Sequence, residues 1–219
     1  MISSVIPKSD VGLIEGRIVE TEAYCQNDPA AHCYDKDSPG DAKETLMNAA
    51  MFCPSGHVYV YPNSQKWCHL NIVGRDSKRQ GKFGSAVLIR ALEPTHNRDR
   101  MSKLRFPNDP DAGLARPWNL CSGPIKLCQA LSISHDGFNK QPISQTNLSL
   151  YNRNPDEVIP VYCDRRIGVP NTWPRRYVWN GCKYLSKREY DSFECTSERL
   201  KELSALKTAS EMCRFFKTN

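Results

Sequence analysis

The stretch GRIVETEAY, from Gly16 to Tyr24, has the pattern of a half-buried β-strand. β-branched and aromatic residues favour strands, and alternate side chains of a strand share one face. Glu20, Glu22 and Tyr24 are therefore expected to project together. By itself the stretch leaves two interpretations open, a solvated strand face or a wall that carries a working carboxylate.

Three further strands and two helices are predicted from the same kind of pattern. A helix is expected at 124–131, because Pro124 suits a first helical position and an apolar stripe follows it. Leucines at helical spacing after Thr196 predict an amphipathic helix towards the C-terminal end. The polar residues 139–154 have no steady periodicity and predict a surface excursion. The further strands are predicted at 58–61, 67–73 and 85–92.

Length and composition indicate one soluble globular domain. The chain has 219 residues, of which 39% are hydrophobic, and this is enough to bury one core. A net charge of +6 is compatible with an anionic partner, although many basic proteins bind no nucleic acid. No apolar run approaches the roughly 20 residues that a membrane span requires, so no membrane partner is expected.

The ten cysteines are interpreted as reduced thiols. No signal peptide precedes them, and none of them forms a CxxC pair. Neither a metal ion nor a cofactor is therefore predicted. The protein is expected to work inside the cell, in the nucleus if the organism is a eukaryote and otherwise in the cytoplasm.

Basic residues gather in three patches, which could contact DNA or could be ordinary solvated loops. For any single patch, solvated loops are the commoner explanation. The patches lie at 75–82, at 98–105, and at Arg165, Arg166, Arg175 and Arg176.

Residues downstream of the first strand could complete a pocket around Glu22. Tyr59 and Tyr61 share a face of their strand, and His32 and Asn71 add an imidazole and an amide. Such a set suits a flat heteroaromatic ligand, because rings stack on rings and polar edges need fixed hydrogen-bond partners. Taken singly, each residue is also explained as a core, cross-strand or solvated side chain.

In combination, these motifs resemble those of the alkyladenine (3-methyladenine) DNA glycosylase family. The resemblance covers most of the chain and depends on several motifs in a fixed order, which makes it more specific than any one of them. The motifs are GRIVETEAY, AAH at 30–32, MF at 51–52, VYVY at 58–61, Asn71, VLIRALEP at 87–94, LCSGPIKLCQAL at 120–131 and RIGV at 166–169.

The resemblance implies a mixed α/β fold, a single domain with a curved antiparallel β-sheet surrounded by helices. We assign 1–186 to this glycosylase domain, with an N-terminal strand that is largely missing, and 187–219 to a helical extension. The implied activity is that of a monofunctional DNA-3-methyladenine glycosylase, expected to be a monomer, which flips damaged purines out of double-stranded DNA. Alkylated purines, hypoxanthine and ethenoadenine are the implied substrates, and an abasic site is the product.

The resemblance also implies roles for individual residues. Glu22 matches the general base, and Arg90 and the carbonyl of Ile167 match groups that hold the nucleophilic water. Asn71 matches a residue that disfavours the amino group of guanine. The other residues that match contacts to the flipped base are Tyr24, His32, Tyr61 and Leu88. The matching DNA contacts are Ser64 at a hairpin tip and, at the start of the predicted helix, Ser122, Gly123 and Lys126.

Two features depart from the family's pattern. Ser64 stands where the family carries an aromatic wedge, and serine cannot fill the gap left by a flipped nucleotide. Either Asn63, Lys66 or Trp67 substitutes for the wedge, or base flipping is weaker. An acidic loop at 33–50 also replaces a short arginine-rich turn, and its carboxylates would repel DNA phosphates.

Two other functions stay open on the sequence. A non-catalytic binder of DNA lesions on the same fold is compatible with Ser64 and with the acidic loop. A zinc nucleobase deaminase would explain His, Glu and Cys residues near a purine pocket, but its H-x-E and P-C-x-x-C motifs are absent. An active glycosylase is preferred because all the matching pocket residues are present.

Overall fold

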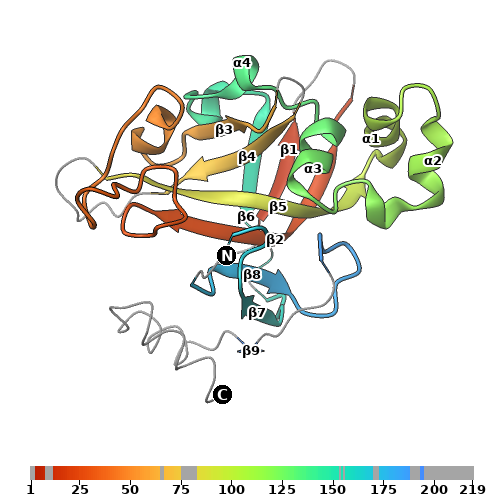
Figure 1. Cartoon of the computed structure of the whole chain (residues 1–219). Coiled ribbons are helices and arrows are strands. Elements are labelled where there is room, and N and C mark those ends of the chain that lie inside the picture. The colour runs from red at the N-terminus through yellow and green to blue at the C-terminus, as the bar shows by residue number, and fades with distance from the viewer. Residues whose placement is uncertain are drawn as a thin grey trace.

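The computed structural model describes residues 3–7, 12–64, 67–74, 83–152, 154, 156–169, 173–187 and 193–194. A nine-stranded sheet runs through them in the order β3-β4-β5-β2-β8-β7-β9, and β1 pairs with both β2 and β6 (Figure 1). The strands are β1 (Ser3–Pro7), β2 (Glu15–Cys25), β3 (Val58–Pro62), β4 (Cys68–Val73), β5 (Ser85–His96), β6 (Leu148–Asn152), β7 (Val161–Asp164), β8 (Arg176–Trp179) and β9 (Phe193–Glu194).

Short helices surround this sheet and complete the expected mixed α/β fold. Figure 1 shows α1 and α2 side by side at one end of the sheet, while α3 packs against β4 and β5. The α-helices are α1 (Arg98–Arg105), α2 (Pro110–Ala115), α3 (Pro124–Ala130) and α4 (His135–Phe138). The 3₁₀ helices are Ala49–Phe52, Pro117–Asn119 and Ile143–Gln145. No helix in the described part of the chain is long and apolar enough to cross a membrane.

Strands β2 and β5 form the long central pair of the sheet. They are antiparallel and stay in contact from Glu15 opposite His96 to Cys25 opposite Ser85. The register of the pair shifts on both sides of Glu20, as in a β-bulge, which changes the direction of the side chains. A Cβ atom on Gly16 would lie 3.1 Å from Leu92, so glycine allows the two strands to approach closely here.

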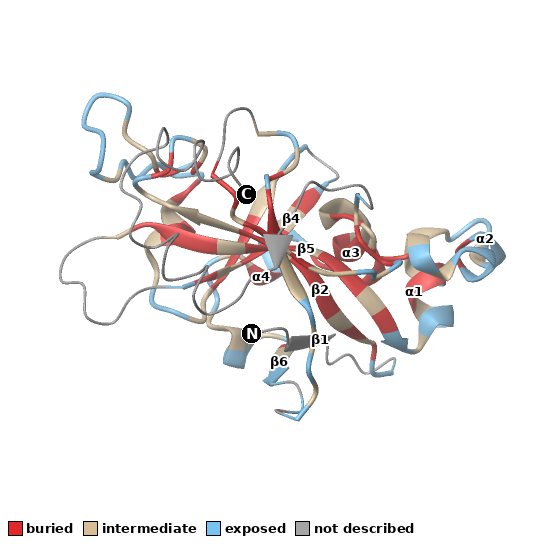
Figure 2. Ribbon diagram, turned by 90° about the horizontal axis from the view of Figure 1, so that it is seen from below, coloured by how far each residue is buried: buried red, intermediate tan, exposed pale blue. Residues whose placement is uncertain are grey.

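The main hydrophobic core lies between the sheet and the helices. Leu70 of β4 and Leu92 of β5 pack with Leu127 of α3 and Met101 of α1. Figure 2 shows the buried residues concentrated along the central strands, whereas α2 is largely exposed. The four strands and the helix predicted for the first 131 residues are all present, because each carries its own apolar periodicity.

Strands β1 and β6 correct two expectations from the sequence. Ser3–Pro7 forms β1, which pairs with β2 and along five residues with β6, so the strand expected to be largely missing is present. Residues 148–152, expected in a surface excursion, form β6. Only Leu148 of β6 is buried, so the strand is made by backbone pairing with the distant β1 rather than by a buried apolar face.

Two further expectations concern the cysteines and the C-terminal end. Seven described cysteines are free thiols, but Cys163 is disulfide-bonded, so the interpretation of all ten as reduced is wrong at this position. A disulfide depends on the distance between two cysteines in the fold, which their sequence spacing does not show. The predicted helix after Thr196 and the basic patch at 75–82 lie outside the described residues.

Arg176 corrects the interpretation of the third basic patch. Its side chain is fully buried, and its Nε lies 2.6 Å from Oε1 of Glu20 while its Nη1 lies 2.7 Å from Oδ2 of Asp164. Arg166 of the same patch is also buried, in an ion pair with Asp28. These two guanidinium groups therefore do not belong to solvated loops, because buried charges are paired.

We expect Arg176→Leu to lower the free energy of unfolding by about 3–5 kcal/mol, because two buried carboxylates lose their main counter-charge. Urea denaturation followed by circular dichroism measures this loss. As a matched control, Arg17→Leu removes a partly exposed ion pair with Glu157, and should cost under about 1 kcal/mol. Equal losses in the two variants would show that the Arg176 ion pairs do not stabilise the fold.

Candidate active site

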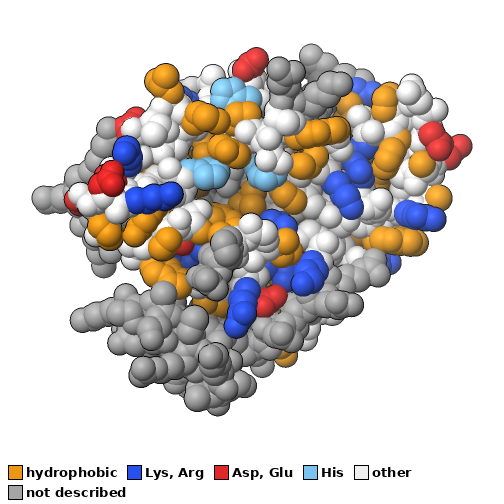
Figure 3. All heavy atoms as spheres, viewed as in Figure 1, with side chains coloured by type: hydrophobic (Ala, Val, Ile, Leu, Met, Phe, Trp, Pro, Cys, Tyr) orange, Lys and Arg blue, Asp and Glu red, His pale blue; other side chains and the backbone are white. Residues whose placement is uncertain are grey.

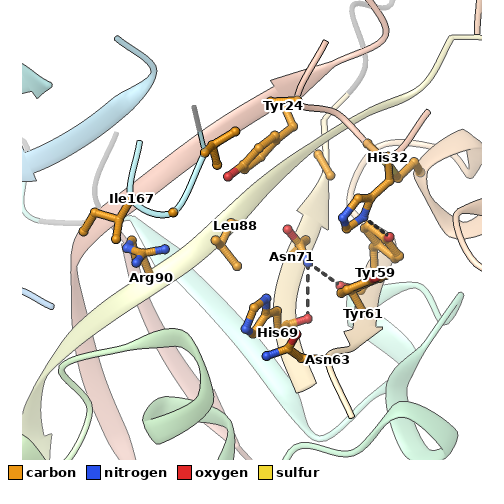
Figure 4. Close-up of a pocket in the computed structure, with 15 residues that line it drawn as sticks. Tyr24, His32, Tyr59, Tyr61, Asn63, His69, Asn71, Leu88, Arg90 and Ile167 are labelled. Carbon is orange, nitrogen blue, oxygen red and sulfur yellow. Dashed lines mark hydrogen bonds between the residues drawn. The ribbon is translucent and has the colours of Figure 1, made fainter. Parts of the chain in front are cut away.

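A cavity of about 340 Å³ opens over strands β2 to β5 and the loop after β7 (Figure 4). Aromatic, imidazole and amide side chains dominate its wall, which is the composition expected for a planar heterocyclic ligand. The lining residues are Tyr24, Ala30, His32, Met51, Tyr59, Tyr61, Asn63, His69, Asn71, Ala86, Leu88, Arg90, Ile167, Gly168 and Val169.

Glu22 lies directly behind the end of this cavity, fully buried on β2. Its Oε1 accepts a hydrogen bond from the backbone N–H of Ile167 at 2.9 Å. Its Oε2 accepts one from the hydroxyl of Tyr24 at 2.8 Å and lies 3.4 Å from Nη1 of Arg90. All three donors belong to cavity-lining residues, and donors converging on both oxygens suit an anionic carboxylate.

Arg90 connects this carboxylate to a second one on the same strand. Its Nε lies 3.4 Å from Oε1 of Glu20 and donates to Oγ of Ser186 at 3.1 Å. Glu20 also accepts hydrogen bonds from the backbone N–H and the hydroxyl of Ser186 at 2.6 and 2.8 Å. The guanidinium of Arg90 is thereby held in place where it meets Glu22, and the two glutamates share a face of β2 as predicted.

Tyr24 forms one aromatic wall of the cavity, and the guanidinium of Arg166 lies 4.4 Å from its ring centre. Arg166 is fixed by an ion pair with Asp28, with 2.9 Å between its Nη2 and Oδ1, and by a hydrogen bond to the carbonyl of Ala23. Burial and the neighbouring Glu22 carboxylate raise the pKa of the Tyr24 hydroxyl. This hydroxyl therefore stays protonated and can keep donating to Glu22.

His32 and Tyr61 form a second ring cluster on the opposite side of the cavity. Their ring centres are 4.1 Å apart with the planes tilted by 37°, and Nδ1 of His32 lies 2.8 Å from the Tyr59 hydroxyl. Burial lowers the pKa of His32, so its imidazole is neutral near pH 7. A neutral imidazole whose Nδ1 is occupied can present only Nε2 to a ligand.

Asn71 lies on the cavity floor with its orientation fixed. Its Nδ2 donates to the backbone carbonyls of Tyr59 at 3.1 Å and of His69 at 3.2 Å, as the dashed lines of Figure 4 show. Both N–H groups of the amide are used, which leaves Oδ1 as its free polar atom. Leu88, the strand partner of Asn71 on β5, adds an apolar part to the wall.

His69 is the lining residue that sequence reasoning missed. It is two residues from Asn71 on β4, so a search for side chains on the same strand face could have found it. Burial, together with the nearby charges of Arg90 and His32, lowers its pKa to about 4. The cavity wall therefore carries two neutral imidazoles near pH 7.

The structure brings together most of the residues selected from the sequence, but not all of them. Ser64, Ser122, Gly123 and Lys126 do not line the cavity. Lys126 instead contacts Asn119 and lies 3.5 Å from the hydroxyl of Ser122. The backbone N–H of Ile167 donates to Glu22, and the contact of its carbonyl with the nucleophilic water stays a prediction. The selected residues that line the cavity are Tyr24, His32, Tyr61, Asn71, Leu88, Arg90 and Ile167.

Charge around the cavity is predominantly positive. Figure 3 shows Lys and Arg side chains gathered beside the central histidines, towards the end of the molecule that holds α1 and α3. No group of three or more His, Cys, Asp or Glu side chains in the described ranges could hold a metal ion. The site thus offers a ring-lined pocket, a buried carboxylate with fixed donors, and basic surroundings suited to an anionic polymer.

Comparison with known proteins places these features in one family. The model of the methylpurine-DNA glycosylase (MPG) family matches residues 1–183. A "Putative 3-methyladenine DNA glycosylase" of Agrobacterium fabrum is 38% identical over 181 residues, which cover 81% of each chain. A protein of the same name from Methanoculleus marisnigri is 37% identical over 178 residues, 79% of this chain and 83% of the relative.

We expect stability to depend on pH through His69. Its folded-state pKa of about 4 lies below its ordinary value of 6.5, so the unfolded chain binds more protons between these values. His69 therefore lowers the free energy of unfolding as pH falls from about 6.5 towards 4, and has no such effect above this range. Urea denaturation of wild type and His69→Asn at several pH values should give a shallower acid decline for the variant. Identical declines would contradict this prediction.

Proposed function

The chain belongs to the methylpurine-DNA glycosylase family, and from this premise we propose that it hydrolyses the N-glycosidic bond of damaged purines with Glu22 as the general base. The observation that supports this role most directly is the position of Glu22. It is a fully buried carboxylate held by Ile167, Tyr24 and Arg90 at the end of a ring-lined cavity. As a DNA glycosylase, the protein has DNA as its partner.

The cavity suits a purine that has left the DNA stack. A purine entering it would stack against Tyr24 on one side and against the ring cluster of His32 and Tyr61 on the other. Such stacking offsets part of the cost of unstacking and unpairing, which is a few kcal/mol. The base would be read by the few polar atoms left free, including Nε2 of His32 and Oδ1 of Asn71.

Glu22 supplies the chemistry that this bond cleavage needs. As the base departs, positive charge develops on the deoxyribose, and a carboxylate beside C1′ stabilises it. The same carboxylate takes a proton from the attacking water, which Arg90 helps to hold next to it. None of the described lining residues is a lysine, in keeping with direct hydrolysis to an abasic site rather than a Schiff-base intermediate.

The proposed substrates are alkylated and deaminated purines. 3-Methyladenine and 7-methylguanine carry positive charge and leave readily, whereas hypoxanthine and ethenoadenine need hydrogen bonding as they depart. Selection against normal guanine is assigned to Asn71. Two hydrogen bonds to backbone carbonyls fix its side chain, so it cannot move aside to make room for the exocyclic amino group of guanine. Shape and fixed hydrogen-bond partners thus set the range of bases accepted.

DNA contacts, oligomeric state and location form the remaining part of the proposal. Ser122, Gly123 and Lys126 at the start of α3 are proposed to contact the DNA backbone, and Ser64 to lie against the duplex. The protein is proposed to act as a monomer, with 1–186 as the glycosylase domain and 187–219 as an extension. The matched relatives named above are bacterial or archaeal, which favours the cytoplasm over the nucleus.

A non-catalytic binder of DNA lesions is the second candidate. It is favoured by Ser64, an exposed small residue where the resemblance calls for an aromatic wedge. A weaker wedge would stabilise the extrahelical base less, but it would leave the geometry around Glu22 intact. The two candidates differ in a single measurable event, release of the base.

Glu22→Gln is expected to slow base release about 10²–10⁴-fold while binding of lesion DNA is retained, because the amide cannot take the proton from water. Single-turnover excision of 7-methylguanine from methylated duplex DNA measures the rate, and a gel-shift assay measures binding. Glu15→Gln, on the same strand but outside the cavity, serves as the matched control and should excise like wild type. Undiminished excision by the Glu22 variant would remove Glu22 from its role.

Wild-type protein should convert a duplex with one hypoxanthine or ethenoadenine into an abasic duplex whose strand breaks only after alkali treatment. This follows from hydrolysis without a covalent enzyme intermediate. Denaturing gels run with and without alkali distinguish the outcomes. Strand cleavage without alkali would contradict the monofunctional mechanism, and binding without base release would favour the second candidate.

A further inference from the structure

The guanidinium of Arg166 supports the site from outside the cavity. Its side chain is fully buried and does not belong to the cavity lining, and it lies over the ring of Tyr24, 4.4 Å from the ring centre. A ring face that is covered in this way has no room for a second ring, so a base that stacks on Tyr24 uses the other face. Any effect of Arg166 on a bound base therefore passes through its neighbours.

Two anchors fix this guanidinium against the ring of Tyr24. Its Nη1 donates to the backbone carbonyl of Ala23 at 2.9 Å, directly before Tyr24 on β2. Its Nη2 donates to Oδ1 of Asp28 at 2.9 Å, and its Nη1 donates to Oδ2 of the same carboxylate. A bidentate ion pair fixes the plane of a guanidinium as well as its position. The ring is thus held at one face, while its hydroxyl is held by Glu22.

Asp28 connects the same guanidinium to the other ring wall of the cavity. Its Oδ1 also accepts a hydrogen bond at 3.0 Å from the backbone N–H of Ala30, which lines the cavity. This turn leads to His32, whose ring packs on Tyr61. Figure 4 shows Tyr24 on one side of the cavity and His32 with Tyr61 on the other. The ion pair therefore joins the two segments that carry the ring walls.

We propose that Arg166 and Asp28 are positioning residues, whose ion pair sets the spacing of the ring walls and so holds a flipped base in its reactive position. This inference rests on the proposed function and identifies residues that act on the base without touching it. A flat base gains stacking energy from both walls only when both lie in van der Waals contact with it. An unsupported wall would leave the glycosidic bond displaced from Glu22.

Arg166→Lys tests this role, because lysine keeps a positive charge near Asp28 but has no flat group to cover Tyr24. Single-turnover release of 7-methylguanine from methylated duplex DNA should be about 10–10²-fold slower than in wild type, as for a misplaced substrate. Affinity for a duplex with one tetrahydrofuran residue, an abasic analogue, should be unchanged, since no base then lies between the walls. Fluorescence anisotropy measures this affinity.

A second substitution shows whether Arg166 acts through the ring of Tyr24. One wall is already lost in Tyr24→Leu, so adding Arg166→Lys to this variant should slow base release little further. A role confined to the stability of the fold would instead leave the two effects on the rate additive. 7-Methylguanine leaves readily, so the release rates of slow variants remain measurable.

Arg17→Lys is the matched control for Arg166→Lys. The guanidinium of Arg17 also lies over an aromatic ring, 5.2 Å from the centre of Trp179, and pairs with Glu157, but it does not line the cavity. This variant should release the base like wild type. Thermal melting establishes that each variant is folded. If Arg166→Lys unfolds, the double variant Asp28→Asn/Arg166→Gln replaces it, because no unpaired buried charge is left, and should show the same slow release.

Three results would overturn the proposal. One is a wild-type rate of base release in folded Arg166→Lys. Another is an equal loss of release rate and of affinity for the abasic analogue, because a general disturbance of the site lowers both. The third is full additivity of Arg166→Lys with Tyr24→Leu. If wild type releases no base from methylated duplex DNA, the proposed function fails together with this inference, and the wild-type protein alone shows it.

Discussion

Two buried carboxylates on β2 need partners from several distant parts of the chain. Glu20 and Glu22 are 1% and 0% exposed, and an uncompensated buried charge costs several kcal/mol. Their partners come from separate segments: Arg90 from β5, Arg176 from β8, Ile167 from the loop after β7, and Ser186 near the end of the described chain. β2 can therefore be buried only when these segments have assembled around it.

The two glutamates have different sets of partners although they share Arg90. Glu20 accepts from Arg176 of β8 and from Ser186, so it connects β2 to two other parts of the chain. Glu22 is fully buried, and the residues that donate to it line the cavity. A carboxylate that is already oriented by its donors does not need to be reoriented when positive charge develops in a transition state. This saving is how preorganised polar sites stabilise such charge.

Neutral rings form the rest of the site and complement its charged end. His32 and His69 are uncharged near pH 7 because burial lowers the pKa of each. A cationic alkylated purine would meet no positive imidazole there, whereas the positive side chain in the wall, Arg90, is engaged with Glu20 and Glu22. In the proposed reaction the ring surfaces would stack on the damaged base, and the carboxylate of Glu22 would lie beyond it.

Local periodicity and motif order were enough to predict the strands of the first half, the helix at Pro124 and one pocket that contains Tyr24, His32, Tyr61, Asn71 and Arg90. The burial of Arg166 and Arg176, the pairing of Ser3–Pro7 with Leu148–Asn152 and the place of His69 in the cavity wall became visible in the folded chain alone. Strand pairing, burial and pKa depend on neighbours that are distant in the sequence, and local patterns do not show them. A charged side chain is buried only where another part of the chain supplies a group of opposite charge.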